Sequence, residues 1–399
     1  MTVEICSGKA KGSVAAPPSK SMAHRYLIAA ALAKGKSVVR GIVYSQDIFA
    51  TIDCLCALGI RIEKQEDHAI VYGGAPLLPK DELLCRESGS TLRFMLPLCL
   101  LSGKEATLRG SDRLMERPLS VYEDLIAEKG FSFKREPGAV TVSGILSAGT
   151  YNVDGGVSSQ FITGLIFALL TRKGESCIHL TGKVESRSYI DLTIDALREF
   201  GFDVRWSNEN TLCLTGGEGI SREITVEGDY SNAAFFDALT LLGGDVQVNG
   251  LNENSLQGDR VYRSYFQALV NGVPTLSLAD CPDLGPILFV AAAALNGGVF
   301  VDTARLKIKE SDRGAAMAEE LKKCGVQVVL EENRIVVPGK KIAAPTERIN
   351  GHNDHRIVMA MAVLLTRVGG IIEGSEAVSK SMPDFFEKLS SLGIEVRNR

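Results

Sequence analysis

The chain has 399 residues, of which 45% are hydrophobic and 23% are charged. That length exceeds what one compact core usually accommodates, so we expect two domains. The net charge of −4 disfavours nucleic acid or an acidic membrane surface as the main partner. No signal peptide is recognisable at Met1, and the longest apolar run, Ile287 to Leu295, is too short to span a bilayer. We therefore expect a cytoplasmic protein.

The nine cysteines and five histidines show no metal-binding or disulfide pattern. Cys54 and Cys56 form the one close pair, and their spacing suits neither a zinc knuckle nor a redox dithiol. We expect reduced thiols, as is usual in the cytosol, with no metal and no cofactor.

The first elements in chain order mix strands and helices. A strand is predicted near Val3–Cys6, which has no helix of its own and could pair with the second half of the chain. The first helix is predicted from Ser21 to Lys34, and a strand from Ser37 to Arg40. A second helix from Asp47 to Leu58 follows, then two strands around 61–62 and 70–72.

This unit recurs along the chain. A helix-like segment ends at a glycine and a β-type stretch follows in six places, at Gly59, Gly130, Gly201, Gly272, Gly325 and Gly393. The spacings are 71, 71, 71, 53 and 68 residues. A glycine after an apolar helix predicts a left-handed C-cap, since glycine carries no Cβ to oppose positive φ.

Six units predict two halves of three. Pro17-Pro18 marks one boundary, and the glycine-rich stretch from Gly216 to Gly228 marks the other. The predicted domains are 18–227, and 1–17 together with 228–399.

The first helix of each unit opens with polar residues. The six openings are Ser19-Lys20-Ser21, Glu87-Ser88-Gly89-Ser90-Thr91, Ser158-Ser159-Gln160, Asp229-Tyr230-Ser231-Asn232, Cys281-Pro282-Asp283 and Asn353-Asp354-His355-Arg356. N-capping alone explains the Ser, Asp, Asn and Gly residues. It does not explain Lys20, Arg25, Arg93 and Arg356, because cations are disfavoured near the positive end of a helix dipole. A bound phosphate or carboxylate would resolve that conflict.

The second helices supply further charge. Arg113 and Arg117 are four residues apart, and so are Lys309 and Arg313. We expect Lys309 and Arg313 to lie on one helix face, with Glu310 beside them. Lys380 is expected to start the last helix. A solvated charged turn would explain Lys309–Arg313 equally well.

These motifs, taken together and in order, resemble the 5-enolpyruvylshikimate-3-phosphate synthase family over essentially the whole chain. The matching segments include Pro18-Ser19-Lys20-Ser21, Ser88-Gly89-Ser90-Thr91-Leu92-Arg93, Arg117-Pro118, Ser158-Ser159-Gln160, Tyr189-Ile190-Asp191, Ser255-Leu256-Gln257-Gly258-Asp259, Pro282-Asp283, Lys309-Glu310-Ser311-Asp312-Arg313, Asn353-Asp354-His355-Arg356 and Lys380-Ser381-Met382-Pro383-Asp384. The resemblance implies an α/β fold of two similar domains, each built of three βαβαββ repeats, that close on small-molecule substrates.

The resemblance also implies the site residues. The N-terminal domain would mainly bind shikimate 3-phosphate, and the C-terminal domain would carry the catalytic carboxylates and the phosphoenolpyruvate clamp. Shikimate 3-phosphate would contact Lys20, Ser21, Arg25, Ser158, Ser159, Gln160, Ser186, Asp283 and Lys309. Phosphoenolpyruvate would contact Lys20, Gly89, Arg113, Gln160, Arg313, Arg356 and Lys380.

By the same resemblance the enzyme transfers the enolpyruvyl group of phosphoenolpyruvate to the 5-hydroxyl of shikimate 3-phosphate, on the route to chorismate and the aromatic amino acids. Asp283 would be the base and Glu310 the acid, with Lys20 assisting. Gly89 stands where resistant family members carry a larger residue, so we predict inhibition by glyphosate.

Two alternatives remain. A UDP-N-acetylglucosamine enolpyruvyl transferase shares the repeats and the reaction, although such enzymes usually carry a reactive cysteine, and residues 110–118 contain none. A non-catalytic anion-binding protein would not need Asp283 and Glu310 among the cations. We expect a monomer, with no nucleic acid or membrane partner.

Overall fold

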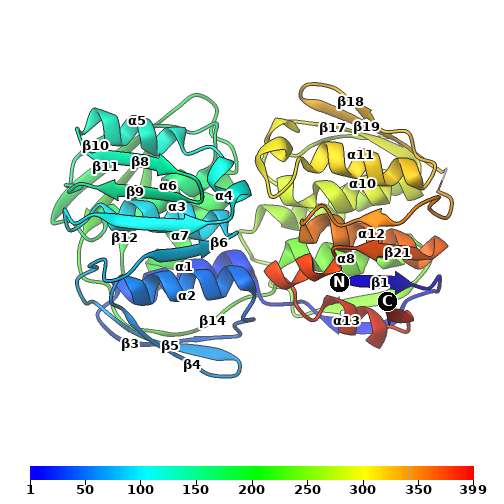
Figure 1. The fold of residues 1–399 in the computed structure, drawn as a ribbon, viewed down its shortest axis with the longest axis horizontal. Coiled ribbons are helices and arrows are strands. Elements are labelled where there is room, and N and C mark those ends of the chain that lie inside the picture. The colour runs from blue at the N-terminus through cyan, green and yellow to red at the C-terminus, as the bar shows by residue number, and fades with distance from the viewer. Residues whose placement is uncertain (341) are drawn as a thin grey trace. The chain divides into compact units, whose positions relative to one another are not determined.

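The computed structural model describes residues 1–340 and 342–399, which divide into two compact units (Figure 1). Unit 1 comprises Met1–Pro17 and Gly228–Arg399, and unit 2 comprises Pro18–Glu227. Each of these two units contains helices and small sheets that are arranged in βαβ repeats. None of the helices within the described ranges has the length and apolar character needed to cross a membrane.

Unit 2 contains seven helices and twelve strands. The helices are α1 (Lys20–Leu32), α2 (Gln46–Ala57), α3 (Gly89–Cys99), α4 (Asp112–Glu116), α5 (Ser120–Glu128), α6 (Ser159–Leu169) and α7 (Arg187–Glu199). The strands are β3 (Gly35–Arg40), β4 (Arg61–Lys64), β5 (His68–Gly73), β6 (Leu83–Arg86), β7 (Ala106–Gly110), β8 (Ser132–Glu136), β9 (Ala139–Ser143), β10 (Thr150–Asp154), β11 (Gly174–Thr181), β12 (Asp203–Asn208), β13 (Thr211–Gly216) and β14 (Glu223–Thr225). The two helices and three strands predicted between residues 21 and 72 are confirmed as α1, α2, β3, β4 and β5.

In its described residues, unit 1 has six α-helices, four short 3-10 helices and ten strands. The α-helices are α8 (Tyr230–Leu241), α9 (Tyr262–Asn271), α10 (Gly285–Ala294), α11 (Arg313–Lys323), α12 (His355–Val368) and α13 (Phe385–Ser391). The 3-10 helices are η1 (Gly258–Val261), η2 (Pro282–Leu284), η3 (Ala304–Ile308) and η4 (Ser375–Lys380). The strands are β1 (Thr2–Ile5), β2 (Lys11–Ala15), β15 (Asp245–Asn249), β16 (Thr275–Ser277), β17 (Gly297–Val301), β18 (Val329–Leu330), β19 (Arg334–Pro338), β20 (Ile349–Asn350), β21 (Gly370–Glu373) and β22 (Val396–Asn398).

Three helices are buried at the centre of each unit. They are α1, α3 and α6 in unit 2, and α8, α10 and α12 in unit 1, and almost every residue in their interiors is buried. Helices that are apolar on all sides must be enclosed by other elements. The sheets and the outer helices, such as the amphipathic α7, provide that enclosure. The central helices therefore fix where their polar N-terminal residues lie.

Five of the sheets share one strand pattern, in which a parallel pair is followed by two antiparallel strands. Their orders are β14-β3-β5-β4, β6-β7-β9-β8, β10-β11-β13-β12, β16-β17-β19-β18 and β20-β21-β1-β22. The sixth sheet has only the parallel pair β15-β2. Six repeats are therefore present, and the fourth of them lacks its final antiparallel pair.

The missing pair explains the irregular spacing in the sequence. After Gly272 the chain runs directly into β16, so the interval from Gly272 to Gly325 is shorter than the others. The prediction of a left-handed cap at Gly272 is wrong: its φ is 168°, which is extended backbone, whereas the other five glycines have φ between 68° and 98°. Asn296 Nδ2 donates to the carbonyls of Leu269 and Val270, so it satisfies the end of α9 in place of a glycine cap.

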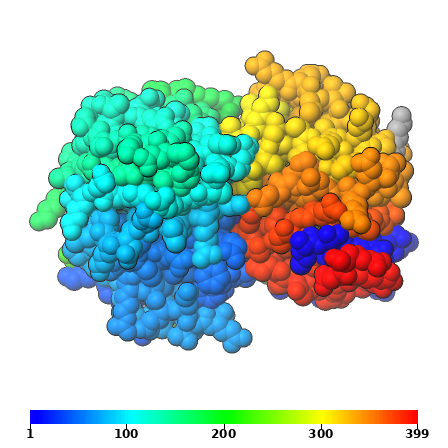
Figure 2. Space-filling model, viewed as in Figure 1, coloured from blue at the N-terminus to red at the C-terminus, as the bar shows by residue number. Residues whose placement is uncertain are grey.

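The N-terminal strand pairs with the second half of the chain, as predicted. β1 lies between β21 and β22 and is antiparallel to both (Figure 1). In the space-filling view the blue N-terminal residues lie against the red C-terminal ones (Figure 2). The first and last residues of the chain thus complete one sheet of unit 1.

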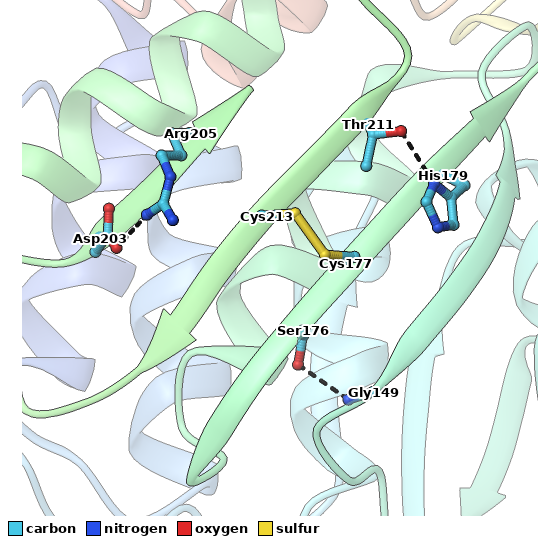
Figure 3. The surroundings of a disulfide bond; sticks show 8 residues. All are labelled: Gly149, Ser176, Cys177, His179, Asp203, Arg205, Thr211 and Cys213. Atoms are coloured by element: carbon cyan, nitrogen blue, oxygen red, sulfur yellow. Dashed lines mark hydrogen bonds and ion pairs between the residues drawn. A yellow bond between two sulfur atoms is a disulfide. The ribbon is translucent and has the colours of Figure 1, made fainter. Parts of the chain in front are cut away.

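The cysteine prediction is partly wrong, because Cys177 and Cys213 form a disulfide (Figure 3). They lie directly opposite each other on the antiparallel strands β11 and β13, with Cα atoms 4.4 Å apart. Their 36-residue separation gives no local motif, so only the strand register reveals the pair. The other seven cysteines are free thiols, and most are buried.

Candidate active site

The polar motifs of unit 2 lie at the N-terminal ends of its three central helices. Ser19, Ser88 and Ser158 are the N-caps of α1, α3 and α6, and each accepts a hydrogen bond from a backbone N–H in the first turn. A helix N-terminus presents unpaired N–H groups and a positive dipole end. The capping interpretation is therefore correct for these serines, and cationic side chains lie beside them.

Lys20 is the first residue of α1 and pairs with Asp47. Its Nζ lies 2.7 Å from Asp47 Oδ2, and both side chains are largely buried. Asp47 lies in the first turn of α2, beyond the N-cap Ser45. Sequence reasoning missed Asp47, because an acidic residue in a first turn is ordinary helix chemistry and only the fold brings it to Lys20.

Arg25 is a buried cation without a carboxylate partner among the described residues. Its guanidinium donates to Thr193 Oγ1, to the Ser21 carbonyl and to the Tyr189 carbonyl, at 2.8–2.9 Å. Burial lowers the pKa of Arg25 to about 10. A charged guanidinium surrounded by neutral acceptors retains positive potential for an anion.

Gln160 links the starts of α3 and α6. Its Oε1 accepts from Arg93 Nη1 at 2.7 Å, and its Nε2 donates to Ser90 Oγ at 2.9 Å. Ser159 beside it is 3% exposed. The structure therefore brings together residues from two motifs that are about 70 positions apart.

Gly89 lies against Arg117. A Cβ added at Gly89 would approach Arg117 Nη1 to 2.5 Å, so no side chain fits without moving the guanidinium. Arg113 lies in the short α4, and its side chain is 46% exposed and 3.7 Å from Glu116. Arg117 follows the end of α4 in an extended conformation, so Arg113 and Arg117 do not share a helix face.

Ser186 precedes α7 with a left-handed backbone, at φ 53° and ψ 44°. Such a conformation is uncommon for residues other than glycine and costs free energy unless its surroundings enforce it. The next residue, Arg187, stacks on Trp206 with its Cζ 3.8 Å from the ring centroid, and Trp206 Nε1 donates to Asp191 at 2.8 Å. These contacts tie the start of α7 to β12.

Unit 1 contains a dense cluster of charges around Asp283, in η2. Asp283 Oδ1 lies 2.7 Å from Arg313 Nη1 and 3.1 Å from Lys309 Nζ, and its Oδ2 lies 3.2 Å from Arg356 Nη2. Burial acts to raise the pKa of Asp283, but Arg356, Lys309 and Arg313 together place it well below its ordinary value. Asp283 is therefore an ionised acceptor.

Arg313 is the centre of this cluster and is 1% exposed. Its Nη2 donates to Glu310 at 2.7 Å, and its Nε donates to Asp354 at 2.8 Å. Asp354, itself fully buried, also caps α12 by accepting from the Arg356 N–H at 2.9 Å. Burial opposes the charge of Arg313, yet Asp354, Glu310 and Asp283 raise its pKa. Asp354 was quoted in the sequence motif without a role, and its N-cap position was the available signal.

Lys309 and Lys380 reach their partners from unexpected elements. Lys309 follows η3 and Arg313 begins α11, so the two do not share a helix face, although both contact Asp283. Burial lowers the pKa of Lys309 to about 8, against the opposing effect of Asp283. Lys380 ends η4 instead of starting α13, and its Nζ donates to the Asn353 carbonyl at 2.6 Å.

One group of potential metal ligands occurs among the described residues. Glu319, Glu320 and His352 bring three ligand atoms within 4.8 Å of one another. The Lys323 ammonium, however, lies 3.0 and 2.8 Å from the two oxygens of Glu320. The buried Glu320 is therefore already paired with a cation, the ammonium of Lys323.

Each unit thus presents its own anion-binding chemistry. Unit 2 offers Lys20, Arg25, serine hydroxyls and helix N-termini, which suit a phosphate ester. Unit 1 offers Lys309, Arg313 and Arg356 together with three carboxylates, those of Asp283, Glu310 and Asp354. This is a combination of charge stabilisation and proton transfer groups. That combination is typical of an enzyme acting on phosphorylated acids.

Comparison with known proteins defines the class. The fold is that of the enolpyruvyl transferases: the enolpyruvyl transferase NikO from Streptomyces tendae matches with a TM-score of 0.77, covering 99% of this chain and 98% of that one, at 14% identity. The structure of EPSP synthase from Acinetobacter baumannii matches with a TM-score of 0.79 and 25% identity, over 100% of both chains.

The sequence comparisons are more specific. The family model of EPSP synthase (3-phosphoshikimate 1-carboxyvinyltransferase) matches residues 6–389. A 3-phosphoshikimate 1-carboxyvinyltransferase from Clostridium kluyveri is 38% identical, over 99% of this chain and 98% of that protein. The chain belongs to the EPSP synthase family.

Proposed function

We propose that this enzyme transfers the enolpyruvyl group of phosphoenolpyruvate to the 5-hydroxyl of shikimate 3-phosphate, releasing phosphate. The observation that carries the proposal is the cluster of Asp283 and Glu310 with Lys309, Arg313 and Arg356, in a chain of this family. Binding alone does not require Asp283 and Glu310 among these cations, since each carboxylate weakens the attraction for an anion. The alternative of a non-catalytic anion-binding protein is disfavoured for that reason.

Substrate binding is assigned as follows. Shikimate 3-phosphate contacts Lys20, Ser21, Arg25, Ser158, Ser159, Gln160 and Ser186 of unit 2, and Asp283 and Lys309 of unit 1. Phosphoenolpyruvate contacts Lys20, Gly89, Arg113 and Gln160 of unit 2, and Arg313, Arg356 and Lys380 of unit 1. The buried Arg25, which lacks a carboxylate partner, supports the first assignment. The half-exposed Arg113 side chain would have to turn away from Glu116 to contact phosphoenolpyruvate.

The reaction is an addition followed by an elimination. Asp283 takes the proton of the 5-hydroxyl as its oxygen bonds to C2 of phosphoenolpyruvate, and Glu310 gives a proton to C3. Glu310 then recovers a C3 proton as the C2–O bond to phosphate breaks, which restores the double bond. The departing phosphate takes the proton that Asp283 holds, so both carboxyl groups return to their starting states. Lys20 and the arginines stabilise the departing phosphate.

The resting charges explain how Asp283 could gain basicity. Three cations make it a weak base in the unliganded cluster. Substrate phosphate and carboxylate groups would draw hydrogen bonds from Arg313, Arg356 and Lys309. Asp283 then loses part of its stabilisation, so its proton affinity rises when substrate is present.

The first test is phosphate release from phosphoenolpyruvate with shikimate 3-phosphate, run beside UDP-N-acetylglucosamine as the alternative acceptor. Release that depends on shikimate 3-phosphate supports the proposal, and release only with the nucleotide sugar rejects the substrate. Asp283→Asn preserves shape and is expected to lower kcat by about a hundredfold or more. Near-normal kcat in that variant would remove Asp283 from the mechanism.

We further propose that the enzyme is a cytoplasmic monomer and is inhibited by glyphosate. The buried repeats complete a separate hydrophobic core in each unit, so neither needs a second copy for stability. Sedimentation analysis tests the oligomeric state. Full activity in millimolar glyphosate would contradict the inhibition.

A further inference from the structure

A row of hydrogen bonds crosses the buried interior of unit 2, from α1 through α2 to the start of α3. His24 Nδ1 lies 2.7 Å from Thr51 Oγ1, which lies 2.8 Å from Thr91 Oγ1. Thr91 Oγ1 in turn lies 2.8 Å from the hydroxyl of Ser88, the N-cap of α3. All four residues are at most 1% exposed. These four residues, the His24 relay, therefore join three helices in a region closed to water.

The His24 relay lies at the end of unit 2 that carries the predicted phosphoenolpyruvate contacts. Lys20 and His24 are one turn apart on α1, and both side chains bond to side chains of α2. Ser88 directly precedes Gly89, the predicted contact at the start of α3. The relay thus connects the helix of Lys20 with the helix end at Gly89, although none of its own residues has an assigned substrate contact.

His24 determines which way the protons of the relay point. Burial, with Lys20 and Arg25 nearby, holds the pKa of His24 well below its ordinary value, so the ring is neutral and has one N–H. Its buried Nε2 has no hydrogen-bond partner among the described residues. A proton on Nε2 would leave a buried donor unpaired, which is costly, whereas a proton on Nδ1 is donated to Thr51. The Nδ1–H tautomer is therefore favoured.

That tautomer fixes the direction of each hydrogen bond that follows. A threonine hydroxyl has a single proton, so Thr51 accepts from His24 and donates to Thr91. Thr91 donates to Ser88 Oγ, which also accepts from the Thr91 backbone N–H at 3.2 Å. Both lone pairs of Ser88 Oγ are then occupied. The proton of Ser88 remains to be donated, and none of the described residues accepts it.

We propose that His24 is a positioning residue that, through the two threonines, orients the Ser88 hydroxyl to donate to an anionic group of phosphoenolpyruvate beside Gly89. Hydrogen bonds to a carboxylate or phosphate are stronger than those between neutral groups, and the unpaired N–H groups at the start of α3 attract the same anion. The inference rests on the proposed function, because it requires phosphoenolpyruvate to bind at this helix end.

The direction of the relay can be measured without an activity assay. In full-length protein labelled with ¹⁵N-histidine, Nδ1 of His24 should show a one-bond coupling to its proton, and Nε2 should resonate as an unprotonated nitrogen. The signals of His24 are identified by their loss in His24→Asn. A proton on Nε2 would overturn the proposal, since the hydrogen bonds would then run from Ser88 toward His24.

The middle of the relay is tested by Thr51→Val, which removes one hydroxyl and leaves the buried ring in place. We expect the KM for phosphoenolpyruvate to rise about tenfold, as the loss of one charge-assisted hydrogen bond predicts, while the KM for shikimate 3-phosphate changes little. Thr107→Val is the matched control. It breaks another threonine pair of unit 2, with Thr141 at 2.9 Å between β7 and β9, and should leave both KM values unchanged. Equal effects of the two variants would contradict the proposal.

A double-mutant cycle tests whether His24 acts through Ser88. His24→Leu and Ser88→Ala should each raise the KM for phosphoenolpyruvate about tenfold, and the double variant should be no worse than either, because all three lose the same donated proton. His24→Asn should keep the wild-type KM, since its amide can donate from the position of Nδ1. Additive effects, or a KM for His24→Asn as high as that for His24→Leu, would overturn the proposal while the wild-type enzyme stays active. A wild-type protein that releases no phosphate would reject the proposed function itself, and this inference with it.

Discussion

At the scale of single residues, Gly89 and Arg117 show how one missing side chain shapes the candidate site. The atom that a Cβ would meet is the end of the flexible Arg117 side chain, not backbone. Substitution would therefore displace a cation while leaving the fold intact.

We expect Gly89→Ala to raise the KM for phosphoenolpyruvate about tenfold, which corresponds to about 1.4 kcal/mol, and to raise the inhibitory concentration of glyphosate further. The melting temperature should change little. Steady-state kinetics with and without glyphosate measure both effects. An unchanged KM would contradict the assignment of Gly89 to the phosphoenolpyruvate site.

The titration of Lys309 predicts that stability and catalytic efficiency change in opposite directions as the pH rises. Since burial favours the neutral amine and lowers its pKa from 10.5 to about 8, the folded state binds fewer protons than the unfolded state in that window. The contribution of Lys309 to stability therefore rises with pH from about 8 to 10.5. Anion binding needs the charged form, so kcat/KM should fall as pH passes about 8.

Lys309→Arg tests that assignment, because a guanidinium stays charged throughout this range. The alkaline limb of the kcat/KM profile should move to higher pH in the variant. The same limb in both proteins would assign the titration to another group.

The sequence indicated candidate charged residues of the site more readily than the residues that they contact. Lys20, Arg25 and Arg356 were identified because cations near helix starts break the usual dipole preference, whereas Asp283 and Glu310 received their roles from the family resemblance. Asp47 and Asp354 were not, because acidic residues at helix starts obey it. Hydrogen-bond partners from different repeats, such as Arg93 and Gln160, become visible only when the helices pack together.

At the scale of elements, the loop before α12 depends on a buried carboxylate. Glu320 of α11 is fully buried and accepts from Lys323, from the Asn350 N–H at 2.9 Å and from His352 Nε2 at 2.8 Å. Burial acts to raise the pKa of Glu320, but His352 and Lys323 lower it overall. His352 has a left-handed backbone, so these bonds offset a strained conformation.

We expect Glu320→Gln to lower the free energy of unfolding by about 2 kcal/mol, because the largely buried Lys323 ammonium loses its counter-charge. Glu319→Gln, a change of the exposed neighbour, should have little effect. Denaturant unfolding at neutral pH measures the difference. Equal stability of the two variants would contradict a structural role for the buried pair.

The repeat pattern was predictable because it is periodic, and its exception was not. Five of the six glycines have the predicted left-handed backbone, whereas Gly272 does not because no antiparallel pair follows α9. The spacing of 53 residues signalled an irregular repeat, but a missing strand pair cannot be told from a shortened loop by spacing alone. Helix boundaries near Lys309 and Lys380 were misplaced for a related reason, since short 3-10 helices lack the apolar periodicity of longer ones.

At the scale of the whole molecule, a net charge of −4 coexists with local groups of cations. The binding of anionic substrates therefore depends on short-range attraction to these cations and not on the overall charge of the protein. Raising ionic strength from about 0.05 to about 0.5 M shortens the screening length severalfold, so the KM for both substrates should rise. Lys and Arg side chains that are nearly buried are screened less, so kcat should change little. A kcat that falls as steeply as kcat/KM would indicate that salt disrupts the folded site itself.

The contact between Arg187 and Trp206 has an optical consequence. Trp206 is the only tryptophan in the chain, so the indole emission of the molecule arises from one position. The cation stacked on that ring belongs to Arg187, which directly follows Ser186, a predicted contact of shikimate 3-phosphate. Any ligand that pulls on the start of α7 shifts the charge lying over the fluorophore, so the protein carries a built-in, label-free signal for occupancy at this end of unit 2.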